Sequence, residues 1–467
     1  MKPGKRSIFI MSLAYIVSVT INGQTDFDIN PTNAGPVRFL TPGSYDLTFY
    51  ARNNDINYPV TYFTACWQLD DGPVNCCNVS SAEMLMYDML YPVYFAEPFM
   101  HCVPLEIGAT GTYQLKYWTS DPEGNPDTNP SNDTLVTTIR VVDTLPARNM
   151  VMFEGTHQDC FPCGGMGEEQ LNLILNTYPE TVSMVSVHAD IATDVLNFDE
   201  GVMFNDTFIF AFSGHPTFLF DLFTFPFYAD PVSMFYWDQT EAVEWREAYP
   251  SPVALSFENV QYDAETISGD VRCTFYADMD ESLSVNVLLT EDSIWGYQNG
   301  YPLGDSLYHR FTLWDFSAGI WGDNTVFPES INEGDEFVYS FELPVSETFN
   351  LDQLYLLAYV QHFSGEAIDS EIYNSAEIRL ADQTVGVPET AERTLKLFPN
   401  PSDDQLYIQA DDDVSSITFY NAQGQVFQLP AKKRLAGWSE IQVKELPAGI
   451  YFVGYAGKPL HKLIIQH

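Results

Sequence analysis

Alternation of apolar and polar residues dominates the first part of the chain. Period-two runs occupy residues 45–50, 60–64, 113–118 and 136–141, and clusters of Asp, Gly and Pro separate several of them. Short strands at this spacing are typical of a β-sandwich, because each strand turns one face toward a shared core. The pattern predicts an Ig-like β-sandwich over residues 25–145.

The pattern changes between residues 147 and 250. Residues 149–153 and 182–187 are apolar runs of strand length, and between them apolar residues such as Leu171 and Tyr178 recur at helical spacing. This order predicts a βαβ unit with parallel strands and a right-handed crossover. Further on, a β-rich domain is predicted over residues 251–381, from strand-like runs at 253–257, 266–276, 282–290, 336–343 and 354–361. The predicted protein is therefore multidomain and mainly β.

A pair of cysteines marks the start of the predicted helix. Cys160 and Cys163 form a Cys-x-x-Cys motif between strand and helix, which is the sequence form of a thioredoxin-like redox site. Backbone N–H groups and the positive end of the helix dipole would favour a thiolate at Cys160, leaving Cys163 to resolve a mixed disulfide. Pro216 opens a later apolar run, and we predict a cis peptide bond there that shapes the partner's groove.

The residues around the motif weaken this chemistry. Asp159 directly precedes the first cysteine, and Glu154, Glu168 and Glu169 add negative charge that opposes a thiolate. His157 is the one nearby residue that could become cationic and tune Cys160. The sequence leaves open whether the pair is redox-active or a static disulfide.

The N-terminus has the form of a secretory signal peptide, predicted over residues 1–23. Lys2, Lys5 and Arg6 precede an apolar run over residues 8–21, and small polar residues follow. The run is short for a bilayer span, and no later stretch is long and apolar enough. We expect an exported mature chain without a transmembrane segment.

Charge divides the chain in two. The formal net charge is −44, and residues 25–388 hold nine basic residues against fifty-five acidic ones. Residues 389–467 hold eight basic and nine acidic residues, which marks a boundary near a predicted linker over 382–394. Because residues 25–388 are so acidic, they would repel nucleic acid, and we do not expect nucleic acid as a partner.

Four further cysteines suit an oxidising compartment. Cys66, Cys76, Cys77 and Cys102 are candidates for one or two structural disulfides, with three complete pairings possible. Cys273 is the odd residue, for which we expect a buried, inert thiol. No metal site or cofactor is predicted.

The last segment, residues 395–467, consists of short alternating strands with recurrent motifs. Pro399, Asn400 and Pro401 open it, and Gly449 and Tyr451 belong to a later motif. The segment resembles the C-terminal sorting domain of the type IX (Por) secretion system of Bacteroidota. This resemblance implies passage through the periplasm, the type IX machinery as a partner, and delivery to the cell surface, the outer membrane or the extracellular space.

A second resemblance covers residues 147–381. Residues 152–163, 185–188, 214–217, 287–292 and 371–376 are similar to an outer-membrane-protein family of Bacteroidota, named for a twenty-eight-kilodalton member. The resemblance implies a thioredoxin-like core. That family usually has Trp before its first cysteine, and Asp159 departs from this pattern.

Two functions follow as hypotheses. The first is an exported, surface-associated thioredoxin-like protein that exchanges disulfides through Cys160 and Cys163 with an unidentified surface or extracellular protein. The alternative is a non-enzymatic binding or adhesion protein on an inert thioredoxin-like scaffold.

Overall fold

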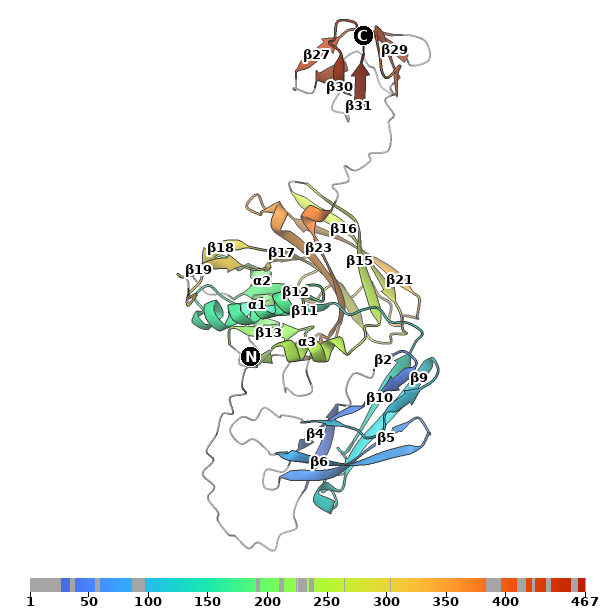
Figure 1. Cartoon of the computed structure of the whole chain (residues 1–467), viewed down its shortest axis with the longest axis vertical. Coiled ribbons are helices and arrows are strands. Elements are labelled where there is room, and N and C mark those ends of the chain that lie inside the picture. Colours follow the sequence, from blue (N-terminus) through green and yellow to red (C-terminus); the bar gives the residue numbers. More distant parts are fainter. Residues whose placement is uncertain are drawn as a thin grey trace, which may run out of the picture. The chain divides into compact units, whose positions relative to one another are not determined.

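The chain divides into two compact units, Met1–Thr384 and Val385–His467. A computed structural model describes residues 27–33, 38–54, 59–85, 97–189, 194–209, 214–223, 225, 233–234, 239–263, 265–302, 304–383, 396–409, 417–421, 425–433, 438–454 and 461–466. Figure 1 shows strands as the main elements of both units. The predicted signal peptide over residues 1–23 lies outside the described residues. The mainly β, multidomain architecture is as predicted.

The first unit begins with two main sheets around one core. One has the order β1-β4-β7 and the other the order β2-β10-β9-β5-β6. Residues such as Ala51 from the first sheet and Phe63, Leu115 and Ile139 from the second share a hydrophobic core, so the alternating runs bury one face each. The strands are β1 (Ile29–Asn33), β2 (Phe39–Leu40), β4 (Thr48–Asn53), β5 (Val60–Leu69), β6 (Val74–Leu85), β7 (Glu97–Met100), β9 (Gly111–Ser120) and β10 (Thr134–Val141), with a small pair of β3 (Gly43–Tyr45) and β8 (Leu105–Ile107).

An eight-stranded sheet forms the centre of the same unit, in the order β14-β13-β11-β12-β20-β17-β22-β23. The predicted βαβ unit is present, because β11 pairs in parallel with β12 and helix α1 lies between them in sequence. The strands are β11 (Met150–Thr156), β12 (Val182–His188), β13 (Thr217–Phe220), β14 (Ser233–Met234), β17 (Leu283–Glu291), β20 (Thr312–Phe316), β22 (Leu354–His362) and β23 (Ile372–Arg379).

Helices cover both faces of this sheet around β11. Val151 and Phe153 pack with Phe204 of α2 (Asp199–Phe204), while Met150 and Met152 share a core with residues of the other two helices. Those helices are α1 (Glu168–Thr177) and α3 (Gln239–Glu247) (Figure 1). Burial on both faces explains why residues 150–153 are apolar without alternation.

The far end of the sheet is covered by three more strands. Val285, Val287 and Leu289 of β17 pack in one core with Val271 and Phe275. The covering strands have the order β15-β16-β21 and are β15 (Val253–Tyr262), β16 (Thr266–Phe275) and β21 (Glu336–Pro344).

The structure differs from the sequence prediction of two separate domains over 147–250 and 251–381. Strand β12 pairs in parallel with β20 through Ser186 and Thr312, so one sheet runs through both segments. Hydrophobic periodicity identifies strands but not their long-range partners, so the prediction missed this continuity.

A buried ion-pair cluster joins distant parts of this unit. Asp221 accepts hydrogen bonds from Arg148 Nη1 at 3.1 Å, Arg246 Nε at 2.8 Å and the backbone N–H of Val151 at 2.8 Å. Arg246 also donates to Glu371 at 2.7 Å. Arg246 and Asp221 are fully buried, so each charge depends on these partners.

The second unit is a small pair of four-stranded sheets around a core that includes Leu406, Phe419, Ile441 and Tyr451. The sheets have the orders β24-β25-β29-β28 and β27-β26-β30-β31. Their strands are β24 (Lys396–Phe398), β25 (Gln405–Gln409), β26 (Ile417–Asn421), β27 (Val426–Leu429), β28 (Ala431–Lys433), β29 (Trp438–Gln442), β30 (Gly449–Gly454) and β31 (His461–Ile465).

Candidate functional site

The cysteine pair lies where β11 gives way to a helix. Cys160 and Cys163 form a disulfide with a Cα–Cα distance of 5.2 Å, and each residue is 4% exposed. Cys163 opens a π-helical turn (Cys163–Gly167) that continues into α1, and its backbone N–H lies 3.1 Å from the Cys160 sulfur. That N–H would stabilise a Cys160 thiolate once the disulfide is opened.

Pro216 lies against this helical turn. The His215–Pro216 peptide bond is cis, as predicted, and β13 begins at the next residue. A Cβ placed on Gly167 would lie 3.2 Å from the Cβ of Pro216, which is a tight contact. The structure therefore brings Pro216 next to the segment that carries Cys163.

His157 does not supply a cation beside Cys160. Burial lowers the pKa of His157, although Asp194 and Asp159 act in the opposite direction. Its ring packs edge-to-face on the ring of His215 at 5.4 Å, and burial lowers the pKa of His215 to about 4. A neutral imidazole stabilises a thiolate less than a cation would, so the predicted tuning role loses its physical basis.

Glu154 is a buried acid behind the disulfide. It is 5% exposed, its Oε2 accepts a hydrogen bond from the Ser186 hydroxyl at 2.8 Å, and burial raises its pKa to about 8. Glu154 and Cys163 both line a cavity of about 20 Å³, which has room for about one water molecule. At neutral pH this carboxyl carries a proton and adds no negative charge near the pair.

From the sequence, Glu154 was interpreted only as a negative charge that opposes a thiolate. A signal was present, because Glu154 is the single charged residue of β11, a strand that is buried along its whole length. A charge in such a run predicts either a partner or a raised pKa.

His188 and Asp194 support the turn before the cysteines. His188 Nδ1 lies 2.8 Å from Asp194 Oδ2, and the same carboxylate accepts the backbone N–H of Gln158 at 2.9 Å. Burial opposes ionisation of Asp194, but its hydrogen bonds and the interaction with His188 leave its pKa lowered. The ionised carboxylate thus anchors the chain two residues ahead of Cys160.

A hairpin from the β-rich segment packs against the turn that carries Cys160. It consists of β18 (Ile294–Tyr297) and β19 (Ser306–His309). Beyond β18, the Gln298 side chain donates to the carbonyls of Cys160 and His157 at 3.0 and 3.2 Å. A Cβ on Gly300, whose φ is 81°, would lie 2.2 Å from the carbonyl oxygen of Phe161. Sequence reasoning missed this hairpin, because nothing local connects residues 294–309 with residue 160.

We expect Glu154→Gln to flatten the dependence of stability on pH. The folded-state pKa of about 8 lies above the ordinary value of 4.5, so the native state holds an extra proton between these values. The contribution of Glu154 to the free energy of unfolding therefore falls as pH rises through this window, by roughly 1.4 kcal/mol for each unit of pKa difference.

Urea unfolding at pH 5 and pH 8 measures this effect. Between these two pH values, the free energy of unfolding should fall by several kcal/mol more in the natural protein than in Glu154→Gln. Glu169→Gln, at an exposed position of α1, is the matched control and should keep the natural slope. If the free energy of unfolding changed equally with pH in all three proteins, the raised pKa of Glu154 would be contradicted.

The other cysteines have different surroundings. Cys66 pairs with Cys76 and Cys77 with Cys102, and Cys273 is a free, fully buried thiol whose pKa burial raises to about 12. Within the described ranges, one His/Cys/acid group has the spacing of metal ligands, namely Cys77, His101 and Cys102. Both of its sulfurs are used in a disulfide, so the group offers no thiolate to a metal.

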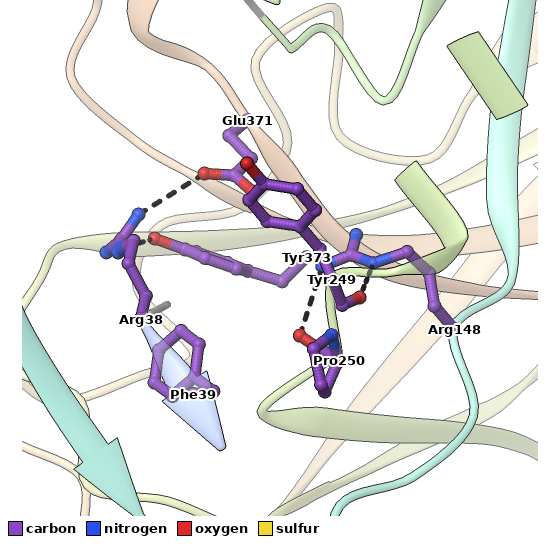
Figure 2. A pocket seen from close by; sticks show the side chains of 7 residues that line it. All are labelled: Arg38, Phe39, Arg148, Tyr249, Pro250, Glu371 and Tyr373. Atoms are coloured by element: carbon purple, nitrogen blue, oxygen red, sulfur yellow. Dashed lines mark hydrogen bonds and ion pairs between the residues drawn. The ribbon is translucent and has the colours of Figure 1, made fainter. Parts of the chain in front are cut away.

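A second small cavity, of about 20 Å³, lies at the buried ion-pair cluster (Figure 2). Arg38 donates to Glu371 and Tyr373, each at 3.2 Å, and Arg148 donates to the carbonyl of Tyr249 at 2.7 Å. The lining residues are Arg38, Phe39, Arg148, Tyr249, Pro250, Glu371 and Tyr373. These polar contacts are made within the protein, and the cavity has room for about one water, so we assign the cluster a structural role.

The sorting-motif residues fix the ends of strands in the second unit. Asn400 donates to the carbonyl of Lys462 and accepts the N–H of Ile464, both at 2.9 Å, between the cis bonds at Pro399 and Pro401. Tyr451 is buried, and its hydroxyl donates to the carbonyl of Pro447 at 2.9 Å. Gly449 begins β30.

Comparison with known proteins gives the class of this protein. Residues 396–466 match the model of the secretion system C-terminal sorting domain. The chain is therefore a multidomain, mainly β protein that a type IX sorting signal directs to the cell surface or the extracellular space. Among the described residues, no helix is long and apolar enough to cross a membrane.

Solved structures similar to this chain include two from Porphyromonas gingivalis. HBP35 is 17% identical over 69% of this chain and 98% of its own, with a TM-score of 0.42. A domain of the outer membrane lipoprotein Omp28 is 16% identical over 28% of this chain and 88% of its own, with a TM-score of 0.18. No curated protein matches the sequence.

Proposed function

We propose that this chain is an exported thioredoxin-like protein whose Cys160–Cys163 pair exchanges disulfides with surface or secreted proteins. The observation that carries the proposal is the position of the pair. It lies between a buried strand and a helix, with Pro216 against the same helical turn and the protonated Glu154 behind Cys163. Disulfide exchange needs a stabilised thiolate and a proton acceptor or donor, and this arrangement offers both.

Each exchange moves two electrons from a partner dithiol to the cysteine pair. A partner thiolate attacks the sulfur of Cys160, the Cys160–Cys163 bond breaks, and Cys163 leaves as a thiolate that Glu154 can protonate. The second partner thiolate then attacks the mixed disulfide, forming the partner's disulfide and releasing Cys160 as a thiolate. The N–H of Cys163, 3.1 Å from that sulfur, stabilises the leaving group.

One observation favours the alternative, a binding or adhesion protein on an inert scaffold. Cys160 is only 4% exposed, and the hairpin loop holds the turn through hydrogen bonds to its backbone. A sulfur that no partner reaches would be a structural crosslink. The two functions differ in whether Cys160 forms a bond to another protein.

Trapping a mixed disulfide separates them. In Cys163→Ser, Cys160 lacks its resolving thiol, so a partner that reacts with it should remain attached and appear as a reductant-sensitive adduct on the cell surface. Cys160→Ser is the matched control and should form no adduct, since it lacks the sulfur that attacks the partner. Absence of any adduct from Cys163→Ser, with normal surface delivery, would favour the inert scaffold.

A further inference from the structure

The hairpin of β18 and β19, which packs against the turn that carries Cys160, also has exposed aromatic side chains. Trp295 is 62% exposed and Tyr297 47%, and they alternate with less exposed neighbours on β18. Tyr308 of β19 stands directly opposite Trp295, is 56% exposed, and packs on it with ring centroids 4.9 Å apart. Phe161, inside the Cys-x-x-Cys motif, is 69% exposed. We name Trp295, Tyr297 and Tyr308 the aromatic platform.

The platform is held rigidly against the cysteine turn. The buried face of β19 carries Leu307 and His309, and both line the cavity that also contains Cys163. The N–H of Asn299 donates to the carbonyl of Gln158 at 2.8 Å, and its side chain donates to the carbonyl of Asp159 at 3.1 Å. A molecule bound on the platform is therefore positioned relative to Cys160.

Exposed aromatic side chains gathered beside a reactive group are typical of a site that binds another protein. The burial of the disulfide adds a second reason. Cys160 is only 4% exposed, so a partner rarely reaches it by random collision. Binding energy from a neighbouring surface can hold a partner in place for the attack. The platform provides such a surface outside the strand–turn–helix unit.

Charge specifies the kind of partner. The phenol of Tyr297 donates a hydrogen bond to the Asp159 carboxylate. Burial and the negative charges of Asp159 and Asp305 raise the pKa of that phenol. Acidic groups among exposed aromatic rings attract Lys and Arg side chains through both ion pairs and cation–π contacts. A second copy of this chain is a poor occupant, because each copy brings a net charge of −44.

We propose that the aromatic platform docks a basic, cysteine-bearing segment of a second exported protein and presents its cysteine to Cys160. This inference rests on the proposed disulfide exchange for its purpose, but its binding step does not require exchange. Trp295 and Tyr308 act as binding residues for the partner's cationic side chains. Asp159, which stands where related motifs have Trp, orients Tyr297 within the platform.

Binding is tested first with peptides that cannot react. One peptide carries Ser in place of cysteine and is flanked by Lys and Arg, and its counterpart carries Glu at the flanking positions. Isothermal titration calorimetry with the full mature chain should give a Kd about tenfold lower for the basic peptide. Trp295→Ala combined with Tyr308→Ala should weaken binding of the basic peptide about tenfold. Val136→Ala, an exposed control on β10, should bind it as tightly as the natural protein does.

Exchange with a small disulfide then distinguishes this inference from the proposed function. Glutathione disulfide needs no docking surface, so its exchange with the reduced natural protein measures the proposed function by itself. If exchange occurs but the two peptides bind the natural protein equally well, or the double variant binds the basic peptide as tightly as the natural protein, the docking inference is overturned and the proposed function stands. If the basic peptide is preferred but no disulfide is exchanged, the platform stands and the proposed function fails.

Discussion

Replacing Asp221 with alanine is expected to lower the free energy of unfolding of the first unit by about 3–5 kcal/mol. Asp221 is fully buried and accepts hydrogen bonds from Arg148, Arg246 and the backbone of Val151. Without it, two buried guanidinium groups lose a shared counter-ion, and Arg148 keeps only carbonyl partners among its hydrogen bonds. An uncompensated buried charge is among the most destabilising changes in a protein.

Urea unfolding of the mature chain measures this loss. Glu336→Gln is the matched control, because Glu336 pairs with Arg272 at 3.1 Å at an exposed position, and its removal should cost less than about 1 kcal/mol. A loss below about 1 kcal/mol for Asp221→Ala as well would show that the ion-pair cluster does not stabilise the unit.

Deleting residues 395–467 is expected to abolish delivery to the cell surface. The deletion removes the segment that matches the sorting domain, and it leaves the first unit, Met1–Thr384, intact. The truncated protein should accumulate in the periplasm while keeping its fold. Surface labelling of intact cells, compared with fractionation, measures the change.

A smaller variant tests the structural side of the same prediction. Asn400→Ala removes both hydrogen bonds that tie the start of the sorting segment to β31, so surface delivery should fall without any loss of residues. Gln425→Ala, at an exposed position of the same unit, is the control.

Normal surface delivery of the chain that lacks residues 395–467 would contradict the role of the tail as a sorting signal.

Local patterns in the sequence predicted much of the fold around the site. The apolar run before Cys160, the helical spacing of Leu171 and the run at β12 gave the βαβ unit, because each is a property of neighbouring residues. Pro216 was predicted correctly to have a cis bond. The alternating runs of the first segment became strands around one core.

Features that depend on distant contacts were not predicted. The single sheet depends on the pairing of β12 with β20, which are more than a hundred residues apart in sequence. Hydrophobic periodicity does not predict which distant strands pair. The hairpin residues Gln298 and Asn299 are polar loop residues in the sequence, and their role comes only from the turn they contact. Glu154 was interpreted as a charge, whereas its burial keeps it protonated at neutral pH.

Thiol–disulfide equilibration of the mature chain determines whether Cys160 and Cys163 are a redox-active pair. The natural protein and Cys160→Ser would be incubated in glutathione buffers of increasing reducing strength, and the state of Cys160 and Cys163 followed by thiol alkylation and mass spectrometry. We predict that the pair opens and closes reversibly, at a reduction potential above about −300 mV. The natural protein should exchange with a model disulfide, and Cys160→Ser should not. A pair that stays oxidised throughout, together with no exchange by the natural protein, would contradict this prediction.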